Sequence, residues 1–188
     1  MSATACVVIP VKDFAQAKLR LAPELGPSER DALARRMASA VVAAAGELPV
    51  AVVCDAESVR AWADVEDVRV IWTPGLGLNG AVRAGVDQLG GEGYRTAIVA
   101  HSDIPLAREL AWVGATPGVT LVPDRALDGT NVLAVPTDVG FRFAYGSGSF
   151  TAHRHEAERL GQQLRIVKDA RLSWDVDLPA DLALPAHP

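Results

Sequence analysis

The sequence predicts an α/β fold, a sandwich built around a mostly parallel and partly mixed central sheet. Short, continuous apolar runs rich in Val, Ile and Ala recur along the 188 residues, and such runs are typical of strands that are buried on both faces. Segments with helical periodicity separate several of these runs, and this alternation favours parallel strands joined by helices. The expected strands are residues 5–11, 50–54, 68–72, 97–100, 119–122 and 132–135.

The helices are expected where apolar residues recur at helical spacing. Ser28 can cap the amino terminus of the first helix, Gly46 can end it, and Gly161 can end the last one. The expected helices are residues 28–45, 80–89 and 149–160.

Residues 121–135 depart from the simple alternation and predict two strands joined by a turn, so part of the sheet should be mixed. No internal repeat, low-complexity tract or linker divides the chain, and 188 residues are enough for one core. We therefore expect a single domain over residues 1–188. Because ligands of such sheets bind at the carboxyl ends of the strands, the loops that follow the strands should form the site.

The overall charge argues against nucleic acid as a partner. The formal net charge is −5 at pH 7 and no local basic stripe offsets it, so a polynucleotide would be repelled. Cys6 and Cys54 fall inside apolar runs, as is typical of buried thiols in a reducing compartment. The first apolar run follows no basic residue and is too short to span a bilayer. We expect a soluble, cytoplasmic protein without a membrane partner.

The connection between the first strand and the first helix, residues 12–27, shows no helical stripe. A structureless connection of this length is uncommon in a compact domain unless it is functional or disordered. Only three of the eighteen basic residues are lysines, and Lys12 and Lys18 both lie here, together with Arg20. Their place at the carboxyl edge of the sheet, before a helix amino terminus, predicts a triphosphate-binding loop. An ordinary solvated loop is the alternative.

Three glycines, Gly75, Gly77 and Gly80, formally match the G-x-G-x-x-G pattern of dinucleotide-binding loops. The run follows the third expected strand rather than the first, and a dinucleotide site would leave the lysine loop without a role. We favour a nucleotide-cradling loop, in which Gly80 allows close backbone approach and Asn79 offers its amide. A turn without a ligand is the alternative.

Aspartates follow buried segments at two distant places. Asp103 comes just after the strand that ends at Ala100, and Asp175 and Asp177 alternate with apolar residues near the end of the chain. If that last segment is a strand, both carboxylates lie on one face, roughly 7 Å apart, and can serve one cluster. Mg²⁺ is usually held by one or two carboxylates together with substrate phosphates. The alternatives are a helix cap at Asp103 and an acidic pair on an exposed edge strand.

A glycine and serine turn, residues 145–150, precedes the last helix, so its backbone N–H groups and the helix dipole predict an anion site. The turn at residues 128–131 can add N–H and hydroxyl donors. Both segments can equally be ordinary turns, with Ser149 as a cap. His153 and His155 are two residues apart on the helix, face different sides, and are assigned no metal.

Taken together, these segments resemble the guanylyltransferases of deazaflavin coenzyme F-420 biosynthesis, which act on 2-phospho-L-lactate or phosphoenolpyruvate. The resemblance spans nearly the whole chain in order. The motifs that carry it are IPVKDFAQAKLRLAP, GLNGAV, HSDIPLA, DGTN, YGSGSF followed by a helix, and WDVDLP.

The resemblance implies a Rossmann-like nucleotidyltransferase fold, with GTP and a small phosphorylated three-carbon acid as substrates and Mg²⁺ as cofactor. It implies that two Mg²⁺ ions are anchored by Asp103, Asp175 and Asp177. It further implies that the carboxylate of the acid is held around Thr130, Gly146 and Ser149. The oligomeric state and a role for His101 do not follow from it.

The expected reaction is attack by a phosphate oxygen of the acid on the α-phosphorus of GTP, with release of pyrophosphate. Asp103, Lys12, Lys18 and Arg20 are the expected catalytic residues, and Lys12, Lys18, Asn79 and Gly80 are the expected nucleotide-binding residues. Two other functions stay open from the residues alone. One is a nicotinamide-dependent oxidoreductase that uses Gly75 to Gly80, and the other is a GTP-binding module without turnover.

Overall fold

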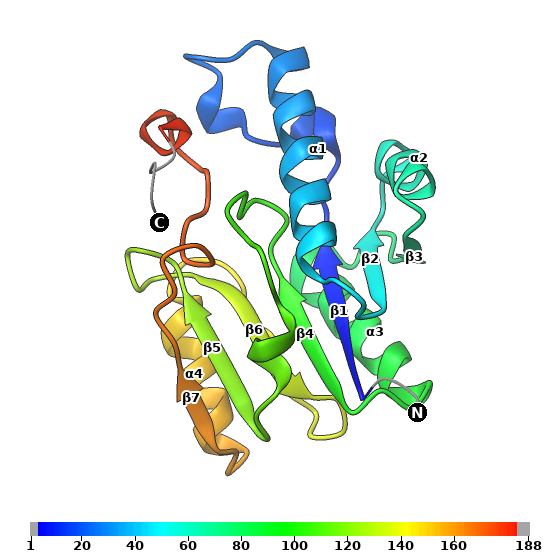
Figure 1. Cartoon of the computed structure of the whole chain (residues 1–188), viewed down its shortest axis with the longest axis vertical. Helices are drawn as coiled ribbons and strands as arrows, with labels where there is room; N and C mark the ends of the chain where they lie inside the picture. The colour runs from blue at the N-terminus through cyan, green and yellow to red at the C-terminus, as the bar shows by residue number, and fades with distance from the viewer. Residues whose placement is uncertain (1–3, 184–188) are drawn as a thin grey trace.

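The computed structural model describes residues 4–183 and contains one seven-stranded sheet in the order β3-β2-β1-β4-β6-β5-β7 (Figure 1). Only β6 runs against its neighbours β4 and β5, whereas the remaining pairs are parallel. The mostly parallel, partly mixed sheet is therefore confirmed. The strands are β1 (Ala5–Pro10), β2 (Val50–Cys54), β3 (Arg69–Trp72), β4 (Thr96–Ala100), β5 (Val119–Pro123), β6 (Thr130–Pro136) and β7 (Leu164–Ile166).

Helices cover both faces of the sheet. The α-helices are α1 (Pro27–Ala44), α2 (Glu57–Val65), α3 (Gly77–Gly91) and α4 (Ser149–Arg159), and the 3-10 turns are η1 (Phe14–Gln16), η2 (Leu19–Leu21), η3 (Ala111–Gly114) and η4 (Pro179–Leu182). Helices α1 and α2 pack on one face, and α3 and α4 on the other (Figure 1). No helix among residues 4–183 is both long enough and apolar enough to cross a bilayer.

The central strand β1 shows why the apolar runs predict buried strands. Val7 and Ile9 face the core under α1, and Cys6 and Val8 face the core over α3, all without solvent exposure. Helix α3 lies close to the sheet because Gly85 has no side chain. A Cβ at Gly85 would lie 2.6 Å from a methyl carbon of Val53, which is closer than carbon atoms pack.

The ends of the predicted helices are mostly confirmed. Gly46 and Gly161 follow α1 and α4 with φ of 60° and 63°, the left-handed conformation that glycine adopts without strain. The predicted cap at Ser28 is wrong, because α1 begins one residue earlier, at Pro27. Proline has no N–H to satisfy and its φ suits the first helical position, and the carboxylate of Glu29 accepts the N–H of Gly26 at 2.7 Å.

Three parts of the chain differ from the sequence predictions. Helix α2 and strand β7 were not predicted, since one has nine residues and the other three. Residues 12–27 are not structureless, because η1 and η2 lie within them. The segment with Asp175 and Asp177 is not a strand, although Val176 between them is buried as alternation requires.

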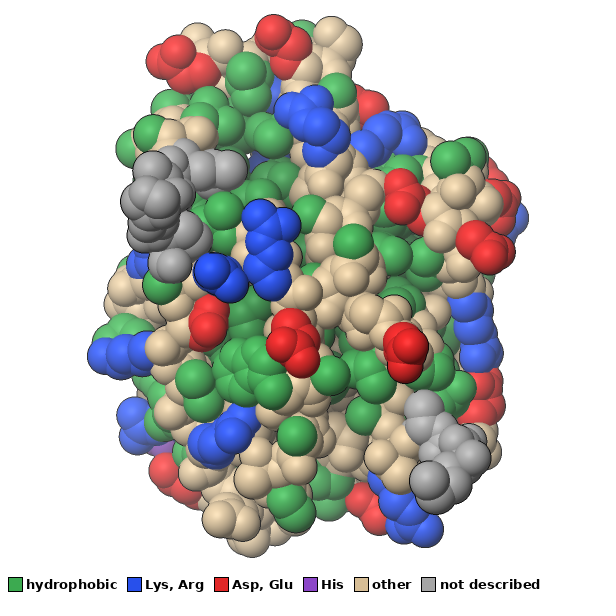
Figure 2. Space-filling view, viewed as in Figure 1, with side chains coloured by type: hydrophobic (Ala, Val, Ile, Leu, Met, Phe, Trp, Pro, Cys, Tyr) green, Lys and Arg blue, Asp and Glu red, His purple; other side chains and the backbone are tan. Residues whose placement is uncertain are grey.

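Charged side chains of both signs are interspersed over the face of the molecule in Figure 2.

Candidate active site

A large cavity of about 720 Å³ opens at the carboxyl edge of the sheet. The loops after β1 and β4 form one part of it, and the β5–β6 turn and the start of α4 form another. Strand β6 runs in the opposite direction, so its first residues, Thr130 and Asn131, reach the same edge. A smaller cavity of about 200 Å³ shares Lys12 and Leu78 with the large one. The site lies where strand order reverses around β1, the place where open α/β sheets bind ligands.

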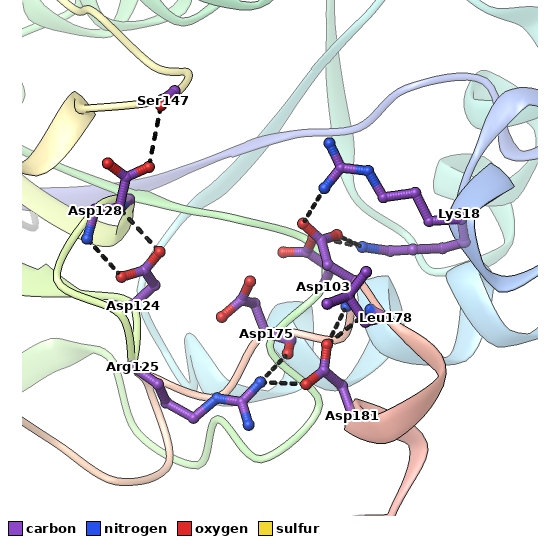
Figure 3. Close-up of polar contacts among 12 residues, drawn as sticks. Lys18, Asp103, Asp124, Arg125, Asp128, Ser147, Asp175, Leu178 and Asp181 are labelled. Carbon is purple, nitrogen blue, oxygen red and sulfur yellow. Dashed lines mark hydrogen bonds and ion pairs between the residues drawn. The ribbon is translucent and has the colours of Figure 1, made fainter.

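The early loop and two distant carboxylates meet in the large cavity. The Lys18 ammonium lies 2.6 Å from Oδ2 of Asp103 and 2.9 Å from Oδ1 of Asp177 (Figure 3). Arg20 is mostly exposed, and its guanidinium lies 3.8 Å from Asp177. Lys18 holds this position with φ of 55°, in the left-handed region that a residue with a side chain seldom adopts. The structure therefore brings together Lys18, Arg20, Asp103 and Asp177.

The third carboxylate is held by an amide. Nδ2 of Asn131 donates to Oδ1 of Asp175 at 3.3 Å and to the carbonyl of Leu172 at 3.1 Å. Partial burial raises the pKa of Asp175 above its usual range, and the negative charges of Asp103 and Asp177 raise it further. The three aspartates thus lie close enough to repel one another.

Ion pairing shifts the pKa values of Asp103 and Lys18. Burial alone would raise the pKa of Asp103, but the Lys18 ammonium outweighs burial and lowers it below its usual range. Burial alone would lower the pKa of Lys18, but Asp103 and Asp177 outweigh it and raise that pKa. Lys18 is therefore an ammonium between two carboxylates at neutral pH.

The carboxylates of Asp103, Asp175 and Asp177 are of the chemical type that binds a hard divalent cation. Carboxylate oxygens are the donors that Mg²⁺ prefers, and Oδ1 of Asp103 is buried without a hydrogen-bond partner in residues 4–183. Within that range, however, no three His, Cys, Asp or Glu side chains are arranged as a ready metal cluster. Instead, the Lys18 ammonium lies between Asp103 and Asp177.

The turn before α4 keeps only part of its predicted anion-binding capacity. The Asp128 carboxylate accepts the hydroxyl of Ser147 at 3.3 Å (Figure 3). It also accepts the N–H of Gly148 at 3.1 Å. The Asp128 carbonyl accepts the N–H of Phe150, and the carbonyl of Gly146 accepts that of Ser149. The N–H groups of Gly146 and Ser147 have no hydrogen-bond partner in the described chain. The N–H of Thr151, in the first turn of α4, likewise has no partner in the described chain, so the free donors lie both in the turn and at the helix start.

Asn79 and Gly80 line neither cavity, so the structure does not place them where nucleotide contact was predicted. Both belong to α3. Oδ1 of Asn79 accepts the N–H of Tyr145 at 2.6 Å, and Nδ2 donates to the Tyr145 carbonyl at 3.2 Å. Asn79 therefore fixes the backbone next to Gly146. Lys12 is exposed and lines both cavities, as a nucleotide-binding residue should.

Two histidines that the sequence left without a role lie at the site. His101 lines the large cavity, and its Nε2 is buried without a partner in the described residues. His153 is fully buried, and its Nδ1 lies 3.0 Å from Oγ1 of Thr130. One signal could have indicated His153, because it follows Ser149 by four residues and so lies on the same helix face.

Residues 5–184 match a family model described as "Guanylyl transferase CofC like". A phosphoenolpyruvate guanylyltransferase of Sphaerobacter thermophilus is 34% identical, with 95% of this chain and 91% of that protein covered. A 2-phospho-L-lactate guanylyltransferase of Halorubrum lacusprofundi is 37% identical, with 88% and 77% covered. A solved structure described as a nucleotide-diphospho-sugar transferase from Desulfovibrio desulfuricans G20 has a TM-score of 0.78 at 17% identity, with 96% and 85% covered, and shares the fold.

The fold is that of a nucleotidyltransferase enzyme. Its site agrees with this class, because charged residues from distant segments surround a cavity at the strand ends. Within that class, the chain belongs to the CofC-like guanylyl transferase family. This membership does not favour the nicotinamide alternative, and the glycine run indeed follows β3, at the edge of the sheet.

Proposed function

We propose that the protein transfers GMP from GTP to phosphoenolpyruvate, or to 2-phospho-L-lactate, and releases pyrophosphate in coenzyme F-420 biosynthesis. The names of the relatives that align over most of the chain support these substrates. The observation that carries the chemistry is the meeting of Lys18, Asp103 and Asp177 in the large cavity, opposite the turn before α4. The two buried free thiols, Cys6 and Cys54, suit the reducing cytoplasm.

The reaction needs positioning and charge neutralisation more than proton transfer. A phosphate oxygen of the acid forms a bond to the α-phosphorus of GTP, and the bond from that phosphorus to the oxygen bridging to the β-phosphorus breaks. The electron pair leaves with pyrophosphate. Because the attacking phosphate is already anionic near neutral pH, no general base is required.

The cations of the early loop would bind the triphosphate. Lys12 is exposed between the two cavities and can reach phosphate oxygens from either one. Lys18 and Arg20 neutralise the carboxylates as well as incoming phosphates, so they keep the cluster from repelling its substrates. Asp103, Asp175 and Asp177 would hold Mg²⁺, which when bound neutralises the charge that develops on the phosphates.

The acid would bind on the other side of the large cavity. Thr130, Gly146 and Ser149 all line it there. The unpartnered N–H groups of Gly146 and Ser147 and the Thr130 hydroxyl can donate to a carboxylate.

A substrate matrix tests this function. The purified protein is incubated with Mg²⁺, each nucleoside triphosphate and each candidate phosphorylated acid, and both pyrophosphate and product mass are measured. We expect product only with GTP and one or both of the two acids. Binding of GTP without pyrophosphate release from any acid would instead show a non-catalytic module and contradict the proposal.

A further inference from the structure

His153 joins the two sides of the acid pocket from inside the core. It belongs to α4, has no solvent exposure, and packs against the rings of Phe141 and Tyr145 with centroid distances of 5.8 and 4.8 Å. Its Nε2 accepts the backbone N–H of Ala144 at 2.9 Å, and its Nδ1 lies 3.0 Å from Oγ1 of Thr130. One ring therefore contacts both the start of β6 and the chain that leads to Gly146.

The Ala144 contact determines which ring nitrogen carries the proton. A backbone N–H can only donate, so Nε2 must be the acceptor and the neutral ring must carry its proton on Nδ1. That proton is donated to Thr130, whose oxygen becomes an acceptor. Burial agrees with a neutral ring, since it lowers the pKa of His153 to about 4.

This arrangement fixes the direction of the Thr130 hydroxyl. Its proton cannot point at the Nδ1 proton, and it makes no donated hydrogen bond within the described part of the chain. Thr130 lines the large cavity. The hydroxyl is therefore left to donate to a ligand oxygen there.

We propose that His153 is a positioning residue of the acid subsite, which orients the Thr130 hydroxyl and fixes the Ala144 to Gly146 backbone for an oxyanion of the phosphorylated acid. The inference rests on the proposed function and goes beyond it, because His153 does not line the cavity. A histidine that only fills the core would affect the stability of the protein and the KM values of both substrates alike. A positioning residue of the acid subsite affects the KM of the acid alone.

Steady-state kinetics with His153→Phe separates these roles. One good hydrogen bond to an anionic ligand corresponds to roughly a tenfold change in affinity. We expect KM for the acid to rise about tenfold and KM for GTP to change less than about twofold. His155→Gln is the matched control, because His155 is exposed on the same helix, and it should leave both KM values unchanged.

A double-mutant cycle tests whether His153 acts through Thr130. Thr130→Val removes the hydroxyl and should itself raise the acid KM. In that background, His153→Phe should raise the acid KM by clearly less than it does in the wild type, because only the bond to the Ala144 N–H remains to be lost. An equal rise of both KM values, or the full single-mutant effect in the Thr130→Val background, would overturn the proposal.

A spectroscopic measurement keeps the proposal testable if His153→Phe does not fold or if no acid is turned over. In the wild-type protein with ¹⁵N-labelled histidine, NMR should show His153 neutral at pH 7 with its proton on Nδ1. A proton on Nε2 would refute the positioning role even in an active enzyme. Conversely, an inactive wild type with the Nδ1 proton would refute only the proposed function.

Discussion

The Asp103 side chain has one oxygen on Lys18 and one buried oxygen without a partner. An oxygen left in that state usually costs about 1–3 kcal/mol of stability, and it is free to bind a ligand atom in the cavity. Asp103 lies three residues after the end of β4, and its carbonyl accepts the N–H of Val176 at 3.1 Å, which ties its backbone to the C-terminal segment.

We predict that Asp103→Asn lowers kcat by at least about a hundredfold, a size typical of losing one electrostatic catalytic group. The melting temperature should fall by only a few degrees, because the amide keeps the shape of the side chain and Lys18 keeps Asp177. Pyrophosphate release and thermal unfolding measure the two effects. Glu109→Gln is a control, since Glu109 is exposed at the end of the same loop. A mutant with near-normal kcat would refute the role of Asp103.

His153 makes stability depend on acid pH. Its pKa falls from 6.5 to about 4 in the folded protein because of burial, with a further lowering by His101 and an opposing effect of Glu156. Below pH 6.5 the unfolded chain binds a proton that the folded chain excludes, so stability falls as pH decreases from 6.5 to about 4.

We predict a loss of up to about 3 kcal/mol over this window from His153 alone. Urea unfolding of the wild type and of His153→Gln at pH 7 and pH 5 measures it. The variant should be less stable at pH 7 and should lose less on acidification. Equal pH slopes in the two proteins would contradict a buried neutral His153.

At the scale of elements, the contact of Arg125 with Trp174 and Asp181, called the clasp below, connects the β5–β6 turn to the C-terminal aspartates. Arg125, in the β5–β6 turn, lies over the ring of Trp174 at 3.8 Å and pairs with Asp181. The other oxygen of Asp181 accepts the N–H groups of Asp177 and Leu178 at 3.0 and 2.7 Å (Figure 3). The turn therefore determines where Asp177 lies without touching it.

We predict that Arg125→Met lowers kcat about tenfold, because small displacements of catalytic groups have effects of this order or larger. The pair is partly exposed and its direct effect on stability should be at most about 1 kcal/mol. Arg171→Met is the matched control, since Arg171 is exposed in the C-terminal segment that contains Trp174, and its side chain makes no hydrogen bond in residues 4–183. Similar kcat values for the two variants would show that the clasp does not position Asp177.

Sequence reasoning succeeds for elements whose patterns are local. The β1 run is buried on both faces and the glycines after α1 and α4 have left-handed φ, as their local context predicts. It could not show the contacts of Arg125 and Asn79, because their partners Asp181 and Tyr145 are far away along the chain. No local pattern shows that the Asn79 amide, which could face a ligand, is hydrogen-bonded to the Tyr145 backbone instead.

At the scale of the whole molecule, the topology explains why distant motifs form one site. Parallel strands end at one edge, and the single antiparallel strand β6 starts there, so the sites after β1 and β4 and before β6 converge. That convergence follows from the predicted fold class. The position of Lys18 between two aspartates does not follow from the fold class. It depends on the left-handed backbone conformation of Lys18, which residue spacing does not predict.

The ion pairs also predict how the molecule responds to loss of divalent cations. Three carboxylates in one pocket would repel one another, but Lys18 lies between Asp103 and Asp177, and Asn131 holds Asp175. We therefore expect the fold to hold the pocket together without a cation, whereas the proposed reaction would need one to neutralise the charge of the triphosphate.

We predict that EDTA abolishes pyrophosphate release and shifts the melting temperature by less than about 2 °C, which for a domain of this size is under about 1 kcal/mol. Added Mg²⁺ should restore turnover fully. In Lys18→Met the same chelator should lower the melting temperature more, because the carboxylates then have neither counter-ion. Turnover that persists in EDTA would contradict a metal-dependent reaction. Unfolding of the wild type by EDTA would instead show that the cation, and not Lys18, holds the carboxylates together.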